Sequence, residues 1–452
     1  MKINSSDQTP PEIPLREALA YWLKLGFISF GGPTAQIAMM HDELVEKKRW
    51  ISERRFLHAL NYCMLLPGPE AQQLATYLGW LMHRTWGGIL AGTLFILPSL
   101  LILIALSWIY LEFGQTPLIA ALFEGIKPAV TAIVIVAVIR IAKRSIRHAI
   151  LAWLAFFSFI AIFVFNVPFP LIIVSAGLIG FFLGQFRPTL FTQQAHTPSN
   201  LSDSSIKALI DDHTPTPEHA RYDATRLYRQ LSIGVLLWLI PIVALILIEG
   251  WKSLYPQIAW FFTKAAFLTF GGAYAVLPYV FQGAVEHYQW LTASQMMDGL
   301  ALGETKPGPL IMVVAFVGFL AGFANDTILG GLGFWGGALG ALVATWFTFL
   351  PSFLFIFLGA PLIESTHGNV RFTAPLTAIS AVVVGVIANL GVFFAYQVFF
   401  PKGFSGGLSV FALLICLASL LLMLRLQWGV IRTLGLAGLL GILFAQSGLL
   451  FS

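Results

Sequence analysis

The segment Lys24-Leu-Gly-Phe-Ile-Ser-Phe-Gly-Gly32 has a close copy farther along the chain, Lys264-Ala-Ala-Phe-Leu-Thr-Phe-Gly-Gly272. The spacing between these copies also separates Trp50 from Trp290, and one Pro-Gly-Pro tripeptide at 67–69 from another at 307–309. Three landmarks at one ungapped spacing indicate an internal duplication. The fold is therefore predicted to consist of two related units.

A polar stretch divides the two units. Residues 187–230 are rich in Pro, Ser, Thr, Asp and His and poor in large apolar residues, which is typical of a solvated linker. Beyond it, Pro98-Ser99 corresponds to Pro351-Ser352 at a wider spacing, so the second unit carries an insertion between 325 and 337. The sequence predicts a cytoplasmic N-terminal segment at 1–16, a first repeat at 17–186, a polar cytoplasmic linker at 187–230, a connecting transmembrane helix at 231–249 and a second repeat at 250–452.

The composition places both units in a membrane. Of the 452 residues, 58% are hydrophobic and 10% are charged, and the mean hydropathy is +0.82. Soluble domains carry roughly 25% charged residues. Apolar runs of about 20 residues recur along most of the chain, and each is long enough to cross a bilayer as a helix. We therefore predict an all-α polytopic membrane protein surrounded by a lipid bilayer.

The net charge of +5 does not indicate a nucleic-acid partner, because basic residues on a membrane protein chiefly set its orientation. The loop before the first Pro-Gly-Pro contains Lys47, Lys48, Arg49, Arg54 and Arg55. Its counterpart at 287–295 contains no Lys or Arg. The first loop is therefore predicted to be cytoplasmic and the second to lie across the membrane. One extra helix at 231–249 would invert the second repeat, an architecture common in secondary transporters.

The apolar segments that open the first repeat, 17–40 and 56–83, are interrupted by Gly31-Gly32-Pro33 and Pro67-Gly68-Pro69. Proline lacks an N–H and breaks a helix. Two interpretations stay open. Each segment is a re-entrant hairpin, whose arms of about 11 to 14 residues rise about 16 to 21 Å to a tip near the bilayer midplane, or each is a kinked helix that spans the membrane. The charge of the intervening loop favours the hairpins.

Irregular backbone at membrane depth must be buried in protein or line a watery cavity. Helix N-termini at such breaks carry partial positive charge and free N–H groups, which attract anions. The breaks therefore predict a central substrate site at Gly31, Gly32, Pro33, Pro67, Gly68, Pro69, Gly271, Gly272, Pro307, Gly308 and Pro309. The alternative is that these motifs only permit kinks or close helix packing.

Charged residues inside the apolar segments add to this hypothesis. Lys24 and Lys264 occupy equivalent positions, and Lys306 directly precedes the second Pro-Gly-Pro. A charge at the bilayer centre costs about 2.5–3.5 kcal/mol on insertion scales, so it is expected to face a cavity or a partner. Paired lysines suit a divalent anion, with Tyr274 as a further hydrogen-bond donor. Alternatively, Lys24 and Lys264 extend to the membrane interface.

Two acids adjoin the Pro-Gly-Pro motifs. Glu70 follows the first, and Glu304 lies three residues before the second. Each is a candidate proton carrier or the counter-ion of a lysine, with Glu304 and Lys306 as a local couple. Glu70 could instead interact only with the dipole of the helix that starts there.

No enzyme motif accompanies these residues. The sequence contains no ATP-binding Gly-x-x-x-x-Gly-Lys-[Ser/Thr], no His-Glu-x-x-His and no Gly-x-Ser-x-Gly. The two cysteines, Cys63 and Cys416, lie in apolar segments without a metal-binding spacing. We therefore expect a non-enzymatic protein without a cofactor or a metal site.

Six motifs are spread over both units: Phe27-Ile-Ser-Phe-Gly-Gly-Pro33, Trp50-Ile-Ser, Pro67-Gly-Pro-Glu-Ala-Gln-Gln73, Leu97-Pro-Ser99, Phe270-Gly-Gly-Ala-Tyr-Ala-Val-Leu-Pro278 and Pro307-Gly-Pro309. Together they closely resemble the chromate ion transporter family in its long, two-domain form. The resemblance covers nearly the whole chain except the linker. One departure is Ala273, which stands where a third glycine often follows the second Gly-Gly pair.

The resemblance implies a multi-pass secondary transporter of the bacterial inner membrane that exports chromate, with sulfate as a chemically similar oxyanion. It also implies coupling to the proton-motive force or exchange for another anion. A transporter of sulfate or another oxyanion and an anion channel remain the alternatives, and a homo-oligomer stays open.

Overall fold

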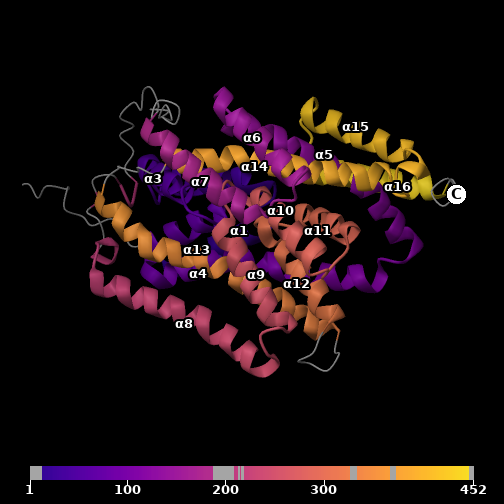
Figure 1. Ribbon diagram of the computed structural model, residues 1–452. Helices are drawn as coiled ribbons and strands as arrows, with labels where there is room; N and C mark the ends of the chain where they lie inside the picture. The colour runs from indigo at the N-terminus through magenta and orange to yellow at the C-terminus, as the bar shows by residue number, and fades with distance from the viewer. Residues whose placement is uncertain are drawn as a thin grey trace, which may run out of the picture.

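The computed structural model describes residues 13–186, 208–211, 214, 218–325, 333–366 and 373–446. Within these ranges the chain is helical (Figure 1), and its only β-type pairing there is an isolated bridge between Ile51 and Ile210. Six of the described helices are long and apolar enough to cross a membrane. The predicted all-α polytopic class is confirmed. Residues 1–12 of the predicted N-terminal segment, and 187–207, 212–213 and 215–217 of the predicted linker, lie outside the described residues.

The first half contains α1 (Leu15–Ile28), α2 (Gly32–His41), α3 (Glu53–Cys63), α4 (Glu70–Phe113), α5 (Pro117–Ser145), α6 (Ala149–Phe163) and α7 (Phe169–Phe186). The second half contains α8 (Ala224–Glu249), α9 (Leu254–Leu268), α10 (Ala273–Phe281), α11 (Ala293–Thr305), α12 (Val313–Ala324), α13 (Phe334–Thr366), α14 (Thr373–Phe399), α15 (Val410–Leu424) and α16 (Val430–Gln446). Both α2 and α10 continue into one turn of π-helix, η1 (Asp42–Lys47) and η4 (Gln282–His287).

The helix α8 is longer than predicted. It begins at Ala224, inside the stretch predicted as the linker at 187–230, because the Asp223 side chain caps it by accepting from the Thr225 N–H at 3.0 Å. Most of its surface is exposed in the monomer, including Leu247 at 81% exposure. Such an apolar face is expected to contact lipid.

The first opening segment, made of α1 and α2, runs into the protein and turns back, so its two ends lie side by side. Glu17 in the first turn of α1 pairs with Lys48 after η1, with 2.6 Å between Oε1 and Nζ. The Tyr21 and Trp50 rings also meet, at 6.2 Å between centroids. The segment therefore forms a hairpin whose tip is the break between α1 and α2. This geometry is that of the re-entrant interpretation rather than of a spanning helix.

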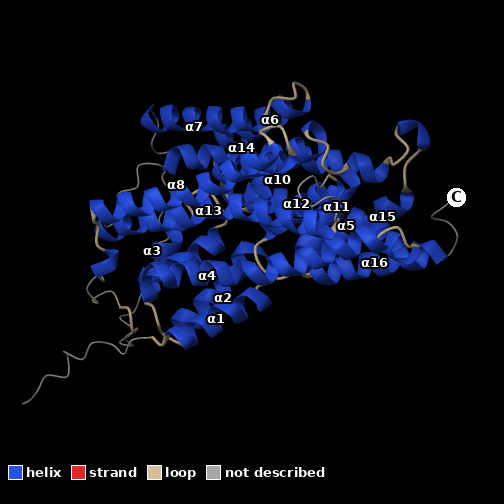
Figure 2. Cartoon of the chain, turned by 90° about the horizontal axis from the view of Figure 1, so that it is seen from below, coloured by secondary structure: helices blue, strands red, loops and turns tan. Residues whose placement is uncertain are grey.

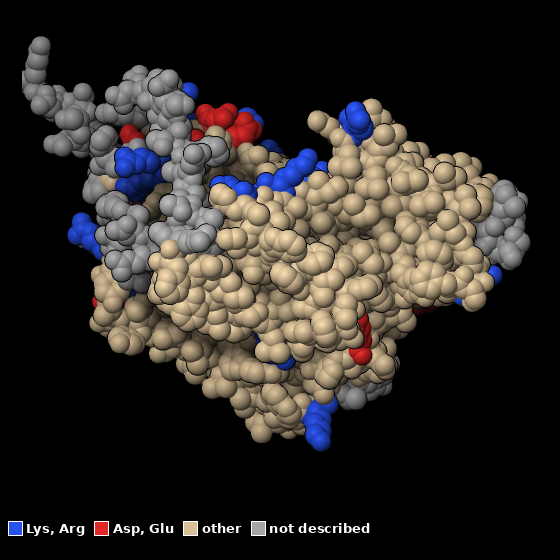
Figure 3. All heavy atoms as spheres, turned by 45° about the horizontal axis from the view of Figure 1, so that its top comes forward, with Lys and Arg blue, Asp and Glu red and all other residues tan. Residues whose placement is uncertain are grey.

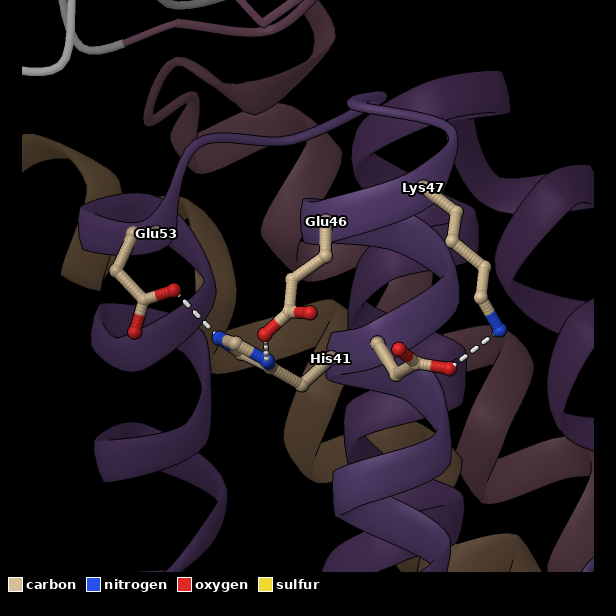
Figure 4. Close-up of polar contacts among 5 residues, drawn as sticks. His41, Glu46, Lys47 and Glu53 are labelled. Carbon is tan, nitrogen blue, oxygen red and sulfur yellow. Dashed lines mark hydrogen bonds and ion pairs between the residues drawn. The ribbon is translucent and has the colours of Figure 1, made fainter.

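The second opening segment is also a hairpin, formed by α3 and the first part of α4. The backbone of α4 leaves helical geometry at His83 and Arg84, and His83 Nε2 donates to the Ile13 carbonyl at 2.7 Å, next to the start of α1. His41 links the two hairpins, with Nδ1 3.5 Å from Glu46 and Nε2 2.5 Å from Glu53 of α3 (Figure 4). Both hairpins thus open at the same end, which we call the basic end.

The second half repeats this arrangement at the other end of the molecule. Phe261 of α9 meets Trp290 at 5.5 Å, as Tyr21 meets Trp50 in the first half. The helices α11 and α12 form the second hairpin of this half. The end of α12 at Phe323 lines one cavity together with Trp290 and Leu111, so α12 ends close to the loop that precedes α11. We call this the distal end.

The helix α4 joins the two ends. From Arg84 at the basic end to Phe113 at the distal end it rises about 43 Å, more than the roughly 30 Å of a bilayer's hydrocarbon core. The two pairs of hairpins therefore open at opposite ends, as expected of inverted repeats. In Figure 2, α3 and α16 lie at opposite ends of the long axis. In Figure 3 most charged side chains gather at the upper left, and the broad middle of that face has few.

Candidate functional site

The tips of the four hairpins meet in the interior. The Gly68 N–H of the first Pro-Gly-Pro donates to the Thr269 carbonyl at 2.7 Å, and the Gly308 N–H of the second donates to the Ser29 carbonyl at 2.9 Å. Ser29 and Thr269 are equivalent positions of the repeat, as are Gly68 and Gly308. Each Pro-Gly-Pro turn is thus paired with the Gly-Gly break of the other half. The structure brings the four predicted breaks together.

Glycine is required at both turns. Gly68 has a φ of 126° and Gly308 a φ of 90°, in the left-handed region that side chains disfavour. A Cβ on Gly68 would lie 2.4 Å from Ser352 Oγ, and one on Gly308 would lie 2.7 Å from Ser99 Cβ. The turns therefore press directly against two serines.

These serines are themselves equivalent, since each follows the helical proline of a long helix, Pro98 in α4 or Pro351 in α13. Ser99 is fully buried and Ser352 is 1% exposed, and neither hydroxyl has a hydrogen-bond partner in the structure. A buried hydroxyl without a partner costs about 1–3 kcal/mol. Two donors at related positions therefore lie ready for a ligand or water beside the breaks. Sequence reasoning used Ser99 and Ser352 only to align the repeats.

Buried glutamines complete the hydrogen bonding of the breaks. Gln36 Nε2 donates to the Ser29 carbonyl at 3.1 Å and to the Gly308 carbonyl at 2.8 Å, and Gln73 Nε2 donates to the Pro67 carbonyl at 2.8 Å. These bonds satisfy carbonyls that the broken helices leave free.

The charged residues around the second turn have further hydrogen-bond partners that the sequence did not predict. Lys306 is 4% exposed, and its ammonium donates to the Pro309 carbonyl at 2.5 Å. Glu304 accepts a hydrogen bond from the Tyr274 hydroxyl. Glu304 and Lys306 also lie within electrostatic range of each other, as the predicted local couple requires, so the contacts with Tyr274 and with Pro309 add to that couple.

Glu70 is 7% exposed at the start of α4, where the predicted helix dipole acts on it. Arg144 of α5 lies within electrostatic range of Glu70. Its guanidinium is 3.6 Å from Sδ of Met64, which lies three residues before the first Pro-Gly-Pro. Arg140, one turn earlier, acts in the same way on Glu304. Neither arginine was assigned to the site from the sequence. Their spacing of four on one helix face was the available signal.

The two repeat-related lysines differ in their surroundings. Lys24 is exposed on α1. Lys264 is half-buried, and its ammonium lies 5.9 Å from the Trp260 ring, one turn back along α9. Whether both lysines face the substrate or extend to the membrane interface therefore stays a prediction.

Two cavities stand out among the described residues, and neither is lined by a break residue. One of about 380 Å³ is lined by Leu111, Trp290 and Phe323, and one of about 190 Å³ by Tyr110, Lys127 and Asp298. Both lie at the distal end. The breaks are instead in contact with one another through the Gly68–Thr269 and Gly308–Ser29 hydrogen bonds.

Comparison with known proteins agrees with this architecture. The sequence model of the family described as "Chromate transporter" matches residues 16–181 and 256–442, one segment in each half. The chain is 33% identical to a chromate transport protein of Pseudomonas aeruginosa over 387 residues, covering 85% of this chain and 82% of the relative. It is 30% identical to the chromate transport protein of Cupriavidus metallidurans over 385 residues, covering 85% and 83%. No solved structure matches the chain. The chain therefore belongs to the chromate transporter family.

Proposed function

We propose that this protein is a secondary active transporter that exports chromate from the bacterial cytoplasm across the inner membrane. The observation that supports it best is the reciprocal contact of the four breaks, with the unpartnered hydroxyls of Ser99 and Ser352 beside them. Family membership supports the substrate, since the named relatives are chromate transport proteins. The export direction and the energy source are part of this proposal.

In the proposed mechanism the substrate binds at the breaks. Chromate is a tetrahedral dianion whose oxygens accept hydrogen bonds, so it suits hydroxyl donors, helix N-termini and nearby cations. Ser99 and Ser352 donate from opposite halves, and Arg140, Arg144 and Lys306 supply positive charge. Gly31 to Pro33 and Gly271 to Gly272 form the facing turns. Sulfate has the same shape and charge, so it is the expected competitor.

The positive-inside rule assigns the basic end to the cytoplasm, together with the N-terminal segment and the linker. The distal cavities then face the periplasm. Two inverted repeats that exchange roles would open the central site to each side in turn. Glu70 and Glu304 stay candidates for a protonation step.

Flux measurements on purified protein in liposomes test this proposal. We expect Ser99→Ala and Ser352→Ala each to raise the KM for chromate by about 5- to 100-fold, the equivalent of one lost hydrogen bond of about 1–3 kcal/mol. Ser107→Ala is the matched control, because Ser107 is an equally buried, unpartnered serine two turns farther along α4. Wild-type KM in both variants would contradict the site. Chromate uptake that is not stimulated by chromate or sulfate on the opposite side would indicate a channel instead.

A further inference from the structure

The smaller distal cavity holds a cluster of ionisable residues that the proposed anion site does not use. Its volume is about 190 Å³, and its lining includes Tyr110 of α4, Glu124 and Lys127 of α5, and Asp298 of α11. Three helices from both halves thus contribute to it. None of the break residues does.

Asp298 is the buried member of this cluster, at 3% exposure. The Tyr110 hydroxyl donates to its Oδ2 at 2.8 Å, whereas its Oδ1 is buried without a hydrogen-bond partner. An ionised carboxylate with an unsatisfied buried oxygen is costly, and the cost disappears when that oxygen binds a proton or a cation.

The neighbouring charges limit what can bind. Lys127 is already paired with Glu124 one turn earlier on α5. The two acids and one lysine sum to a negative charge, which disfavours an oxyanion. A metal ion would have to displace or face the Lys127 ammonium and would need several oxygen ligands. A proton needs only the free oxygen of Asp298.

The other elements packed against α11 add no competing group. The helix α12 and the turn at Leu310–Met312 contain no titratable residue, and the only one in the described part of α16 is Arg432, which is exposed. Tyr110, Glu124 and Lys127 are therefore the titratable and charged side chains that face Asp298.

We propose that Asp298 is the proton-binding carboxylate of the transport cycle, taking up one proton from the distal solvent through this cavity and releasing it later in the cycle. This inference rests on the proposed function, because it assigns the coupling step of the same transporter. It places that step at Asp298 rather than at Glu70 or Glu304.

The position of Asp298 connects the cavity to the anion site. It lies two turns before the end of α11 at Thr305, directly ahead of Lys306 and the second Pro-Gly-Pro turn. The helix is closely packed against α12, since a Cβ on Gly299 would lie 2.4 Å from the Phe316 ring. Neutralising Asp298 changes its hydrogen bond to Tyr110 of α4. Because α11 is closely packed, it would pass this change to the second Pro-Gly-Pro turn by moving as one rigid body.

The test compares two fluxes of the full-length protein in liposomes, chromate accumulation driven by a pH gradient and chromate counterflow without a gradient. We expect the ratio of driven flux to counterflow to fall at least tenfold in Asp298→Asn and to be largely restored in Asp298→Glu. Glu112→Gln is the matched control, because Glu112 is an exposed acid at the same end of α4. An unchanged ratio in Asp298→Asn would overturn the inference while leaving the proposed function intact.

A second measurement does not depend on transport. Difference infrared spectra between low and high pH should show the carbonyl stretch of a protonated carboxyl in the wild type and in Glu112→Gln. We expect this band to lose the intensity of one carboxyl in Asp298→Asn, and a band of full intensity there would overturn the inference. Absence of chromate counterflow in the wild type would contradict the proposed function alone, since the infrared titration still reports on Asp298.

Discussion

The two Pro-Gly-Pro turns share one backbone arrangement and differ in the side chains around it. Gly68 and Gly308 both donate to the opposite Gly-Gly break and both press against a buried serine. Around them the equivalent pairs, first half then second, are Gln36 and Val276, Met64 and Glu304, Leu66 and Lys306, and Glu70 and Leu310. The two halves therefore share the backbone arrangement of the turns but differ in the polar side chains around them.

This difference has a consequence for transport. In inverted repeats with identical side chains, the states open to the two sides would be related by symmetry and equal in free energy. Unequal side chains remove that equality, so a bound ion can favour one state over the other. In the proposed mechanism the shared backbone would provide the alternation, and residues such as Lys306 and Glu70 would make one state more stable than the other.

The largest effect is expected from breaking the shared frame. Gly68→Ala and Gly308→Ala should each reduce chromate flux at least tenfold, because a Cβ at either position clashes within 3 Å and requires a positive φ. Gly272→Ala controls for φ alone, since its φ is 100° and no atom lies within 4 Å of the added Cβ. Flux per folded protein, measured in liposomes, gives the comparison. A large loss at only one of Gly68 and Gly308 would show that the two turns are not functionally equivalent.

A second test concerns the side chains that differ. Lys306→Met should reduce chromate flux about tenfold or more, because it removes a buried charge and leaves the Pro309 carbonyl without its donor. Lys24→Met, which changes an exposed lysine, should stay within about twofold of the wild type. The reverse order of effects would return Lys24 to the anion site and remove Lys306 from it.

The sequence was sufficient to predict the breaks, because Gly-Gly and Pro-Gly-Pro interrupt apolar runs by local chemistry alone. It also predicted that they recur in both halves, since the repeat is visible in the residues themselves. It also placed the end of the second opening segment at 83, and the backbone leaves helical geometry there, at His83 and Arg84, although neither proline nor glycine stands at those two positions.

The candidate site was harder to predict, because its side chains owe their roles to distant partners. The sequence couples Lys306 to Glu304, but it does not show that Tyr274 of α10 also donates a hydrogen bond to that carboxylate. Asp298 has no feature in the sequence that distinguishes it from an acid on an amphipathic helix. Only its burial beside Tyr110 of the other half makes it a candidate.

A smaller effect is expected from Gln36, an amide that the second half lacks. Gln36→Leu should lower the free energy of unfolding by about 1–3 kcal/mol, because the carbonyls of Ser29 and Gly308 lose their donor inside the protein. Thermal denaturation in detergent measures this, with Gln257→Leu as a control in which the amide bonds a carbonyl at an exposed site. Equal melting temperatures for both variants would mean that the two breaks do not depend on this amide.

The smallest effect is expected at the basic end. The described part of the linker covers this end and not the distal end. His219 Nε2 donates to the Trp80 carbonyl of α4 at 2.9 Å, and Arg55 donates to the Thr214 carbonyl at 2.5 Å. Burial lowers the pKa of His219 from its ordinary value, and the charges of Arg84 and Arg226 act in the same direction. The docked linker thus prefers the neutral imidazole.

The sign of the pH effect follows from that preference. Docking is fully favoured above the ordinary pKa of histidine, about 6.5, and weakens as the pH falls below it, because the undocked linker binds the proton more readily. Limited proteolysis of the linker should therefore be faster at pH 5.5 than at pH 7.5 in the wild type. His219→Gln should remove most of this difference, since an amide can still donate to Trp80 and does not titrate. A protease profile that keeps its pH dependence in His219→Gln would assign the effect to another group at the basic end.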